Sequence, residues 1–383
     1  MLTFIAFAAF AAWGWLTLLR GGFWRADARL TDKADPAAWP DIVAVIPARD
    51  EAETIGEVIR AHMTADYPGS LTVILADDGS TDGTAEIARG AAAQSARPFE
   101  VVSVPPLPEG WTGKLWAVEN GLSRAKEIAP DAKYVLLTDA DIALARDTLS
   151  RLAAKAEDED LALTSLMARL DSRGPWASFL IPAFIYFFQK LYPFPRANDP
   201  NDNLAAAAGG CMLVRRDAID AIGGVAAFKA TLIDDCTFAK AVKDLTPSTK
   251  IWLGLAQDEA ISLRDNRDLS SIWNMVARTA YAQLGFSPLL LGGTVIGMAL
   301  VYLAAPLILL TAMWHWNFTA LFYAAGACAL MAYTYWPTLR LYGRAPWEAA
   351  LLPVAAGFYT AMTVSSALRH WRGEGSQWKG RAY

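Results

Sequence analysis

The sequence predicts an α/β fold, in which helices flank a mostly parallel sheet, with transmembrane helices at both ends of the chain. Two observations support this prediction. Over residues 41–270, short apolar runs alternate with helical patterns, which is typical of parallel strands that helices cover on both faces. Near each end of the chain lie apolar runs that are long enough to cross a bilayer.

The composition favours a membrane protein. Of the 383 residues, 54% are hydrophobic and 15 are tryptophan, and the net charge is −5. This acidic balance provides no basic surface for phosphate backbones, so nucleic acid is excluded as a partner. The three cysteines are widely spaced, so neither a disulfide framework nor a zinc site is expected.

Residues 1–20 are expected to form a transmembrane anchor, and residues 21–40 a linker. A cleaved signal peptide is the alternative, but no basic residue precedes the apolar run, whereas Arg20 and Arg25 follow it. The excess of positive charge after the anchor then places the domain at 41–270 in the cytoplasm.

Residues 284–368 are expected to form a block of membrane helices, followed by a basic tail at 369–383. Three spans after a cytoplasmic domain would leave the tail outside, but its basic residues favour the inside. Gly292, Gly293 and Pro306 therefore suggest a re-entrant or in-plane portion. The side of the membrane on which the tail lies stays open. The apolar stretches are Leu284–Trp314, Phe318–Trp336 and Ala349–Leu368.

Two further segments are expected to lie near the membrane. Pro175–Phe194 is apolar and aromatic but contains Pro182 and Lys190, so an interfacial helix is favoured, with a true span or a buried core helix as alternatives. Residues 271–283 are expected to form a helix at the membrane surface.

Four near-continuous apolar runs are the expected strands, and each ends near polar residues. In parallel sheets, ligands bind beyond the carboxyl ends of the strands, so the polar residues there are the candidate site. Three such clusters occur, namely Ala48–Glu51 (ARDE), Asp77–Thr84 (DDGSTDGT) and Asp139–Asp141 (DAD). The expected strands are Ile42–Pro47, Leu71–Asp77, Glu100–Val104 and Tyr134–Thr138, and the expected helices are Glu53–Met63, Thr84–Ala93, Leu115–Lys126 and Arg146–Ala156.

Asp139 and Asp141 are the candidate metal ligands. In an extended backbone, residues i and i+2 face the same side, so both carboxylates could meet at one point. Mg²⁺ or Mn²⁺ commonly takes one or two carboxylates together with substrate phosphate oxygens. The alternative is that these aspartates cap the helix that begins near Arg146.

The other two acidic clusters could bind a nucleoside. A carboxylate of Asp77 or Asp78 could accept the imide N–H of a uracil ring, and the ARDE segment could hold the ribose or the base. Helix capping is the alternative for both clusters.

Three further candidates carry charge. Lys114 lies on a glycine turn before a helix, where it could meet phosphate, or it could be a solvated surface lysine. Asp235, with Asp234 in reserve, could be the general base that takes a proton from an acceptor hydroxyl, or both could cap a helix. Arg278, on an apolar helix, could pair with a diphosphate, a lipid headgroup or a structural carboxylate.

These motifs, taken in order, resemble the family 2 inverting glycosyltransferases over most of residues 41–278. The terminal membrane segments resemble the membrane branch that contains ceramide glucosyltransferases and, most closely, the hopene-associated glycosyltransferases of bacteria. The motifs are PARDE (Pro47–Glu51), DDGSTDGT, GK followed by AVENG, TDAD, GGCMLVRRDAIDAIGG (Gly209–Gly224) and DD before an arginine helix, with WKGRAY at the end of the chain.

The resemblance implies a GT-A fold, a nucleotide-diphosphate sugar as donor, and Mg²⁺ or Mn²⁺ at Asp139 and Asp141. It further implies that Asp235 is the base and that Gly209 and Gly210 border the acceptor site. The donor-binding residues would be Pro47, Arg49, Asp50, Glu51, Asp77, Asp78, Lys114, Asp139 and Arg278, with Asp50 and Asp77 at the nucleoside.

One departure from the family pattern bears on the product. Where membrane relatives carry a (Q/R)xxRW motif, residues 275–279 read MVART. The missing tryptophan counts against processive polymerisation. We therefore expect transfer of a single sugar. The resemblance further implies a UDP-sugar as donor, a lipid acceptor related to hopanoids and a location in the bacterial inner membrane. A polyprenyl-phosphate sugar transferase and a nucleotidyltransferase are the alternatives, and the oligomeric state stays open.

Overall fold

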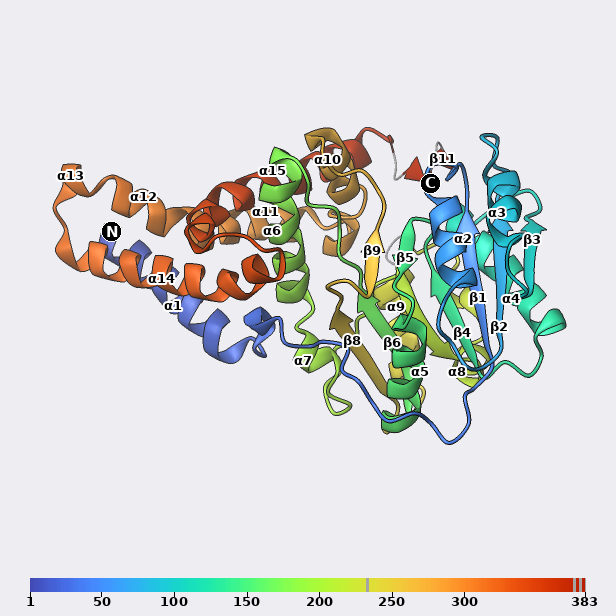
Figure 1. Ribbon diagram of the computed structural model, residues 1–383. Coiled ribbons are helices and arrows are strands. Elements are labelled where there is room, and N and C mark those ends of the chain that lie inside the picture. Colours follow the sequence, from blue (N-terminus) through green and yellow to red (C-terminus); the bar gives the residue numbers. More distant parts are fainter. Residues whose placement is uncertain (232–233, 375–376, 379–380, 383) are drawn as a thin grey trace. The chain divides into compact units, whose positions relative to one another are not determined.

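The computed structural model describes residues 1–231, 234–374, 377–378 and 381–382, and the chain divides into two compact units (Figure 1). We call them the sheet unit and the helical unit. The sheet unit comprises Ala28–Asp171, Arg196–Arg264 and Gln377–Tyr383, and the helical unit comprises Met1–Asp27, Ser172–Pro195 and Asp265–Ser376. Each unit is thus discontinuous in sequence.

The sheet unit contains a seven-stranded sheet that is mostly parallel, as the sequence predicts. Strand β7 runs antiparallel to both of its neighbours, β4 and β6, while the other strands of this sheet share one direction. The order reverses at β1, which has β2 on one side and β4 on the other, and such switch points are where open sheets bind ligands. In spatial order the strands are β3 (Phe99–Ser103), β2 (Leu71–Asp77), β1 (Ile42–Ala48), β4 (Tyr134–Thr138), β7 (Cys211–Arg215), β6 (Leu161–Met167) and β8 (Lys250–Leu255).

Helices cover both faces of this sheet and create two cores. One core packs α2 (Ile55–Met63), α3 (Thr84–Ala92) and α5 (Thr148–Glu159) against one face. The other packs α4 (Gly113–Ile128), α8 (Arg216–Ala221), η2 (Val225–Phe228) and α9 (Asp234–Lys243) against the opposite face. The strands β1, β4 and β6 are buried along their whole length, which explains their near-continuous apolar sequences.

A second, two-stranded sheet fixes the turn that follows β4. Strand β5 (Ile142–Leu144) pairs antiparallel with β9 (Ala260–Ser262), so that Ile142 lies opposite Ser262. The Leu263 N–H also donates to the Asp141 carbonyl over 2.7 Å. The DAD turn is therefore held by a segment more than a hundred residues further along the chain.

The expected linker at 21–40 is partly ordered on the sheet unit. Arg29 forms a parallel bridge with Leu255 of β8, and the Leu255 N–H donates to the Ala28 carbonyl over 2.8 Å. The side chain of Leu30 is buried in the first core. This segment therefore covers the edge of the sheet beyond β8, which would otherwise be exposed.

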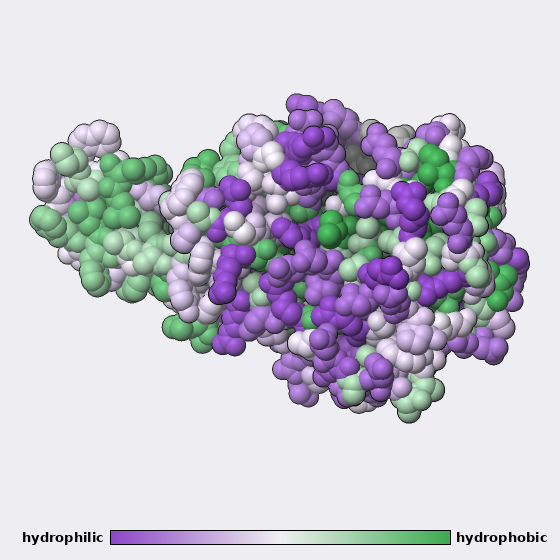
Figure 2. Space-filling view, in the orientation of Figure 1, coloured by the Kyte–Doolittle hydropathy of each residue, from purple (hydrophilic) through white to green (hydrophobic). Residues whose placement is uncertain are grey.

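The helical unit contains the apolar helices. Within the described part of the chain, four helices are long and apolar enough to cross a membrane, namely Leu2–Leu19, Pro288–Leu310, Phe318–Leu341 and Pro346–Trp371. Figure 2 shows hydrophobic side chains gathered on the surface of these helices. The elements are α1 (Leu2–Leu19), η1 (Phe23–Arg25), α6 (Pro175–Leu191), α10 (Leu269–Ala277), η3 (Ala282–Leu284), α11 (Pro288–Met298), η4 (Ala299–Ala304), α12 (Ala305–Leu310), α13 (Ala312–His315), α14 (Phe318–Leu341), η5 (Pro346–Leu351) and α15 (Leu352–Trp371).

The stretch in which a re-entrant portion was expected is one continuous helix in the structure. Its middle segment, η4, is a π-helical turn directly before Pro306. Proline has no N–H to donate, and a local π-turn accommodates the interruption without breaking the helix. The Trp13 Nε1 donates to the Val301 carbonyl inside this turn over 2.7 Å, so α1 supplies a partner to a backbone group there.

Helix α6 belongs to the helical unit and does not meet the length and hydropathy that the four long helices share. The side chains of Leu180, Ile181 and Tyr186 are fully buried. The Tyr186 and Thr334 hydroxyl oxygens lie 2.8 Å apart, and the Tyr359 hydroxyl donates to the Leu180 carbonyl. These bonds join α6 to α14 and α15.

Gly121 permits the close packing of α4 on β1. A Cβ atom at this position would lie 2.4 Å from the Cγ1 of Val45. We therefore expect Gly121→Ala to destabilise the protein by about 1–3 kcal/mol through overpacking. Gly90→Ala on α3 is the control, because a Cβ atom there meets nothing within 4 Å. Thermal unfolding of both variants in detergent tests this, and equal midpoints would contradict the packing argument.

His62, on α2, predicts a loss of stability in mild acid. Its Nδ1 lies 2.8 Å from the Val58 carbonyl, and its Nε2 has no hydrogen-bond partner among the described residues. Burial lowers the pKa of the imidazole. The unfolded histidine binds its proton below about pH 6.5, whereas the folded one resists it, so stability falls as the pH drops below that value. His62→Leu should flatten the dependence of the thermal midpoint between pH 7.5 and 5.5, and an unchanged slope would refute this.

Candidate active site

The candidate site lies at one edge of the large sheet, where polar residues follow the ends of parallel strands and precede the start of an antiparallel one. The parallel strands β1, β2 and β4 end at this edge, and the antiparallel β7 begins there, since Thr138 at the end of β4 pairs with Cys211 at the start of β7. Gly209 and Gly210 precede β7. They therefore reach the same edge as the acidic strand ends.

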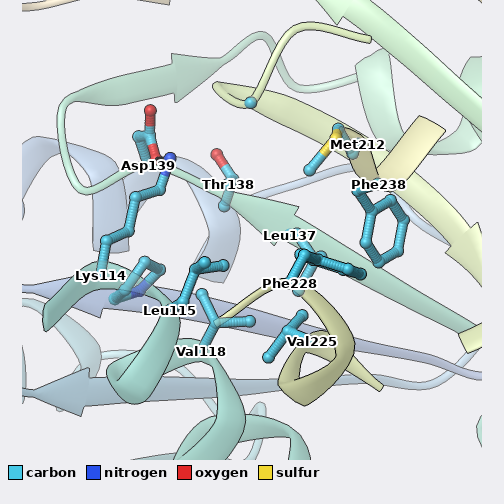
Figure 3. A pocket seen from close by; sticks show the side chains of 12 residues that line it. Lys114, Leu115, Val118, Leu137, Thr138, Asp139, Met212, Val225, Phe228 and Phe238 are labelled. Carbon is cyan, nitrogen blue, oxygen red and sulfur yellow. Dashed lines mark ion pairs between the residues drawn. The ribbon is translucent and has the colours of Figure 1, made fainter. Parts of the chain in front are cut away.

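Lys114 and Asp139 form an ion pair at this edge. Lys114 lies in the first turn of α4, and its Nζ is 3.0 Å from the Asp139 Oδ1 (Figure 3). The side chains are 27% and 34% exposed, respectively, so both are accessible to a ligand. An ammonium group at a helix N-terminus is suited to an anionic ligand.

Gly209 brings the predicted base next to this pair. Its N–H donates to the Asp235 Oδ2 over 3.1 Å. A Cβ atom on Gly209 would lie 3.3 Å from the Lys114 Nζ and 3.6 Å from the Asp235 Oδ2. A glycine here therefore lets Lys114 and Asp235 approach one backbone segment closely. The side chain of Asp234, the reserve base, lies outside the described part of the structure.

A pocket opens beside these residues. Its space amounts to about 360 Å³, part of which is open to solvent. Figure 3 shows Lys114 and Asp139 on one side and an apolar wall on the other. The lining residues are Pro47, Lys114, Leu115, Val118, Leu137, Thr138, Asp139, Gly209, Met212, Val225, Phe228 and Phe238.

Gly210 supports the mouth of this pocket. Its carbonyl accepts a hydrogen bond from the Thr138 Oγ1 over 2.8 Å. A Cβ atom on Gly210 would lie 3.1 Å from the Cγ1 of Ile142, so the glycine permits β5 to pack closely. Gly210 therefore joins the ends of β4 and β7.

The backbone at Asp139–Asp141 is not extended, contrary to the prediction from the sequence. Residues 139–141 form a turn, in which the Ile142 N–H donates to the Asp139 carbonyl. The Asp141 side chain is only 10% exposed, and its Oδ2 lies 3.1 Å from the Arg264 Nε. Burial raises the pKa of the Asp141 carboxyl; Arg264 opposes this shift, and the like charge of Asp139 adds to it.

The residues fit a divalent cation that arrives with a phosphate ligand. Among the described residues, no three His, Cys, Asp or Glu side chains gather in a way that could hold a metal ion. Asp139 nevertheless offers an accessible carboxylate, and Mg²⁺ is commonly held by one or two carboxylates plus substrate phosphates and water. Asp141 would be the second carboxylate only if it shared its oxygens with Arg264.

The ends of β1 and β2 form a hydrogen-bonded pair of turns. The Thr81 N–H donates to the Asp50 Oδ1 over 2.8 Å, and the Asp50 N–H donates to the Ser80 Oγ. The Ser80 hydroxyl also donates to the Asp77 Oδ1. Asp50 has φ of +50°, a strained conformation that aspartate tolerates better than most residues. Asp50 and Asp77, the two predicted nucleoside contacts, therefore lie close together and are joined through Ser80.

The remaining donor-binding candidates lie in different surroundings. The side chain of Asp78 is 2% exposed, and its carboxylate lies 3.4 Å from the Arg49 Nη1. This ion pair therefore has mainly a structural role. Pro47 lines the pocket, and Glu51 lies 3.9 Å from Arg264. Arg278 follows α10 in the helical unit, and its part in donor binding stays a prediction.

The sequence did not identify Arg264 or the apolar wall of the pocket. Arg264 follows a three-residue strand, β9, which is too short to show a pattern. In the sequence, Phe228 and Phe238 cannot be told from ordinary core residues. Only the fold shows that they line a pocket. The pairing of β5 with β9 was the missing information.

The fold and this edge define an open α/β domain with a polar site at the carboxyl ends of its parallel strands, and similar domains occur in known proteins. The family described as Glycosyl transferase family 2 matches residues 43–223. A solved structure, the mannosyltransferase PcManGT from Pyrobaculum calidifontis in complex with GDP-Man and Mn²⁺, is similar with a TM-score of 0.56 and 21% identity, over 97% of this chain and 99% of that one. The predicted GT-A type of fold is thereby confirmed.

A curated relative is an N-acetylglucosaminyltransferase of Mesorhizobium japonicum (strain LMG 29417 / CECT 9101 / MAFF 303099). It is 28% identical over 145 residues, which are 37% of this chain and 32% of that protein. The matched part thus spans about a third of the relative's length. Residues 43–223 are thus similar to glycosyltransferase family 2 domains.

Lys114 should dominate the affinity of this edge for phosphate groups. Lys114→Gln removes a charged hydrogen bond, which is worth about 1.5–3 kcal/mol, so binding of inorganic pyrophosphate with Mn²⁺ should weaken roughly 10- to 100-fold. Lys126→Gln on the same helix is the control, because Lys126 is 59% exposed and pairs with Asp220. Calorimetric titration measures both; equal affinities would argue against a phosphate role for Lys114.

Proposed function

We propose that this protein is a membrane-bound inverting glycosyltransferase, which transfers a single sugar from a UDP-sugar to a lipid acceptor. The observation that supports this best is the meeting of an accessible carboxylate, a lysine and a second aspartate at one pocket mouth. Asp139 pairs with Lys114, and Gly209 lies against both Lys114 and Asp235. These are the groups that sugar transfer from a diphosphate requires.

The donor's diphosphate would lie at Lys114 and Asp139. Asp139, with Asp141 behind it, would hold a Mg²⁺ or Mn²⁺ ion, whose charge stabilises the departing diphosphate. Lys114 adds a preorganised positive charge at the place where negative charge develops in the transition state. The Mn²⁺ in the similar mannosyltransferase supports this assignment. Asp50 and Asp77 would contact the nucleoside, together with Pro47, Arg49, Glu51 and Asp78.

Asp235 would be the general base. Its carboxylate accepts hydrogen bonds from the backbone N–H groups of Gly209 and Cys236, which keep it in a fixed orientation. A carboxylate held in this way can take the proton of an acceptor hydroxyl while that oxygen attacks the anomeric carbon, and a direct attack inverts the configuration. Gly209 and Gly210 would border the acceptor.

A lipid acceptor is proposed because of the helical unit. Four of its helices are long and apolar enough to cross a membrane, which suits an enzyme whose substrate resides in a bilayer. We place the protein in the bacterial inner membrane with the sheet unit in the cytoplasm, where nucleotide sugars are made. The hopanoid character of the acceptor rests on the sequence resemblance.

The proposal is tested by incubating the full-length protein in detergent with membrane lipids, Mn²⁺ and a panel of nucleotide sugars. Mass spectrometry should show a lipid that has gained one hexose unit, together with release of a nucleoside diphosphate. Release of pyrophosphate would instead indicate a nucleotidyltransferase. A product that forms only with polyprenyl phosphate would identify the acceptor as a lipid phosphate.

Two substitutions separate metal binding from base catalysis. Asp139→Asn should abolish metal-dependent turnover. Asp235→Asn should leave donor binding intact and lower the transfer rate by roughly 10²- to 10⁴-fold, the usual contribution of a general base. Asp244→Asn is the control, because Asp244 directly follows the same helix and pairs with Lys240 on the surface. Normal turnover in both site variants would defeat the assignment.

A further inference from the structure

Arg264 joins two acidic strand ends of the site. Its Nε lies 3.1 Å from the Asp141 Oδ2, and its Nη2 lies 3.9 Å from the Glu51 Oε1. Glu51 follows β1 and Asp141 follows β4. One guanidinium group therefore links the end that is expected to bind the nucleoside to the end that is expected to bind the metal.

The position of Arg264 is fixed by the small sheet. Arg264 comes two residues after β9, and its backbone N–H points to the Ser262 Oγ. The Ser262 hydroxyl in turn lies 3.4 Å from the Asp141 Oδ2. The same carboxylate oxygen thus accepts hydrogen bonds from a neutral donor, Ser262, and from a charged donor, Arg264. Groups of the protein itself therefore already bind the Asp141 carboxylate.

Lys114 and Arg264 neutralise most of the charge of the three carboxylates that they contact, without an added ion. Glu51, Asp139 and Asp141 contribute three negative charges, and Lys114 and Arg264 contribute two positive ones. A free divalent cation would have to displace or approach a guanidinium group to reach Asp141, which costs electrostatic energy. A cation that arrives with a diphosphate brings the compensating negative charge with it.

We propose that Arg264 is a positioning residue that occupies Asp141 until the donor binds, so that the site takes up its divalent cation together with the diphosphate and not before it. This inference rests on the metal-dependent chemistry of the proposed function. Arg264 acts through Asp141: once a diphosphate is present, its negative charge compensates that of the cation, and the Asp141 carboxylate can turn from the guanidinium group to the cation.

The test measures Mn²⁺ binding by electron paramagnetic resonance, on the full-length protein in detergent, with and without uridine diphosphate. In the unaltered protein, uridine diphosphate should strengthen Mn²⁺ binding at least about tenfold. Equal affinities in its presence and absence would overturn the proposal before any variant is made. The readout needs no acceptor and no turnover.

Arg264→Gln should strengthen Mn²⁺ binding in the absence of uridine diphosphate by roughly tenfold, because a competing charged hydrogen bond of about 1.5 kcal/mol or more is lost. Arg264→Lys keeps the charge and should restore the dependence on uridine diphosphate. Arg146→Gln is the matched control, since Arg146 forms an exposed pair with Asp66 close to the end of β5.

Two other outcomes would each overturn the inference. Unchanged Mn²⁺ binding with weaker uridine diphosphate binding in Arg264→Gln would mean that Arg264 acts on the donor directly. Weaker Mn²⁺ binding in this variant would mean that the arginine supports the metal ligands instead of competing for them. If the expected shift occurs but no lipid is glycosylated, the inference stands and only the proposed acceptor fails.

Discussion

The reversed direction of β7 is the constraint on which the candidate site depends. If β7 ran parallel to β4, its carboxyl end would lie at this edge, and Gly209 and Gly210 would lie at the opposite one. The antiparallel pairing of Thr138 with Cys211 instead brings a glycine turn beside the carboxyl ends of β1, β2 and β4. Because Gly209 has no side chain, Lys114 can approach it from α4 and Asp235 from α9.

Electrostatics at this edge follows from the same geometry. The strand ends concentrate carboxylates, and unpaired carboxylates at short range repel one another. Two cationic side chains from elements distant in sequence partly neutralise this charge: Lys114 at the start of α4 and Arg264 in the segment after β9. Both members of the Lys114–Asp139 pair are accessible to a ligand, whereas in the second pair Asp141 is only 10% exposed and Arg264 is 42% exposed.

The sequence predicted the first half of the sheet well, because β1, β2 and β4 are buried on both faces and read as apolar runs that end in acidic residues. It did not predict β6, β7 and β8 individually, nor the pairing of β5 with β9, since three-residue strands carry no periodic signal. Lys114, Asp139, Gly209 and Asp235 were named from sequence and lie together. Arg264 was missed because its partner, Asp141, is 123 residues away. The assumption of an extended backbone at Asp139–Asp141 was wrong, since these residues lie in a turn, and the shared metal site stays a prediction.

The interruption of the sheet unit by α6 has a consequence for biosynthesis. Strands β3, β2, β1 and β4 precede α6, while β7 follows it and lies between β4 and β6. Proteins leave the ribosome N-terminus first, at about 5–20 residues per second, so the nascent chain presents an unpaired edge on β4 for many seconds. Such edges promote aggregation. With the protein placed in a membrane, as we propose, the early attachment of α1 would keep growing chains apart during this interval.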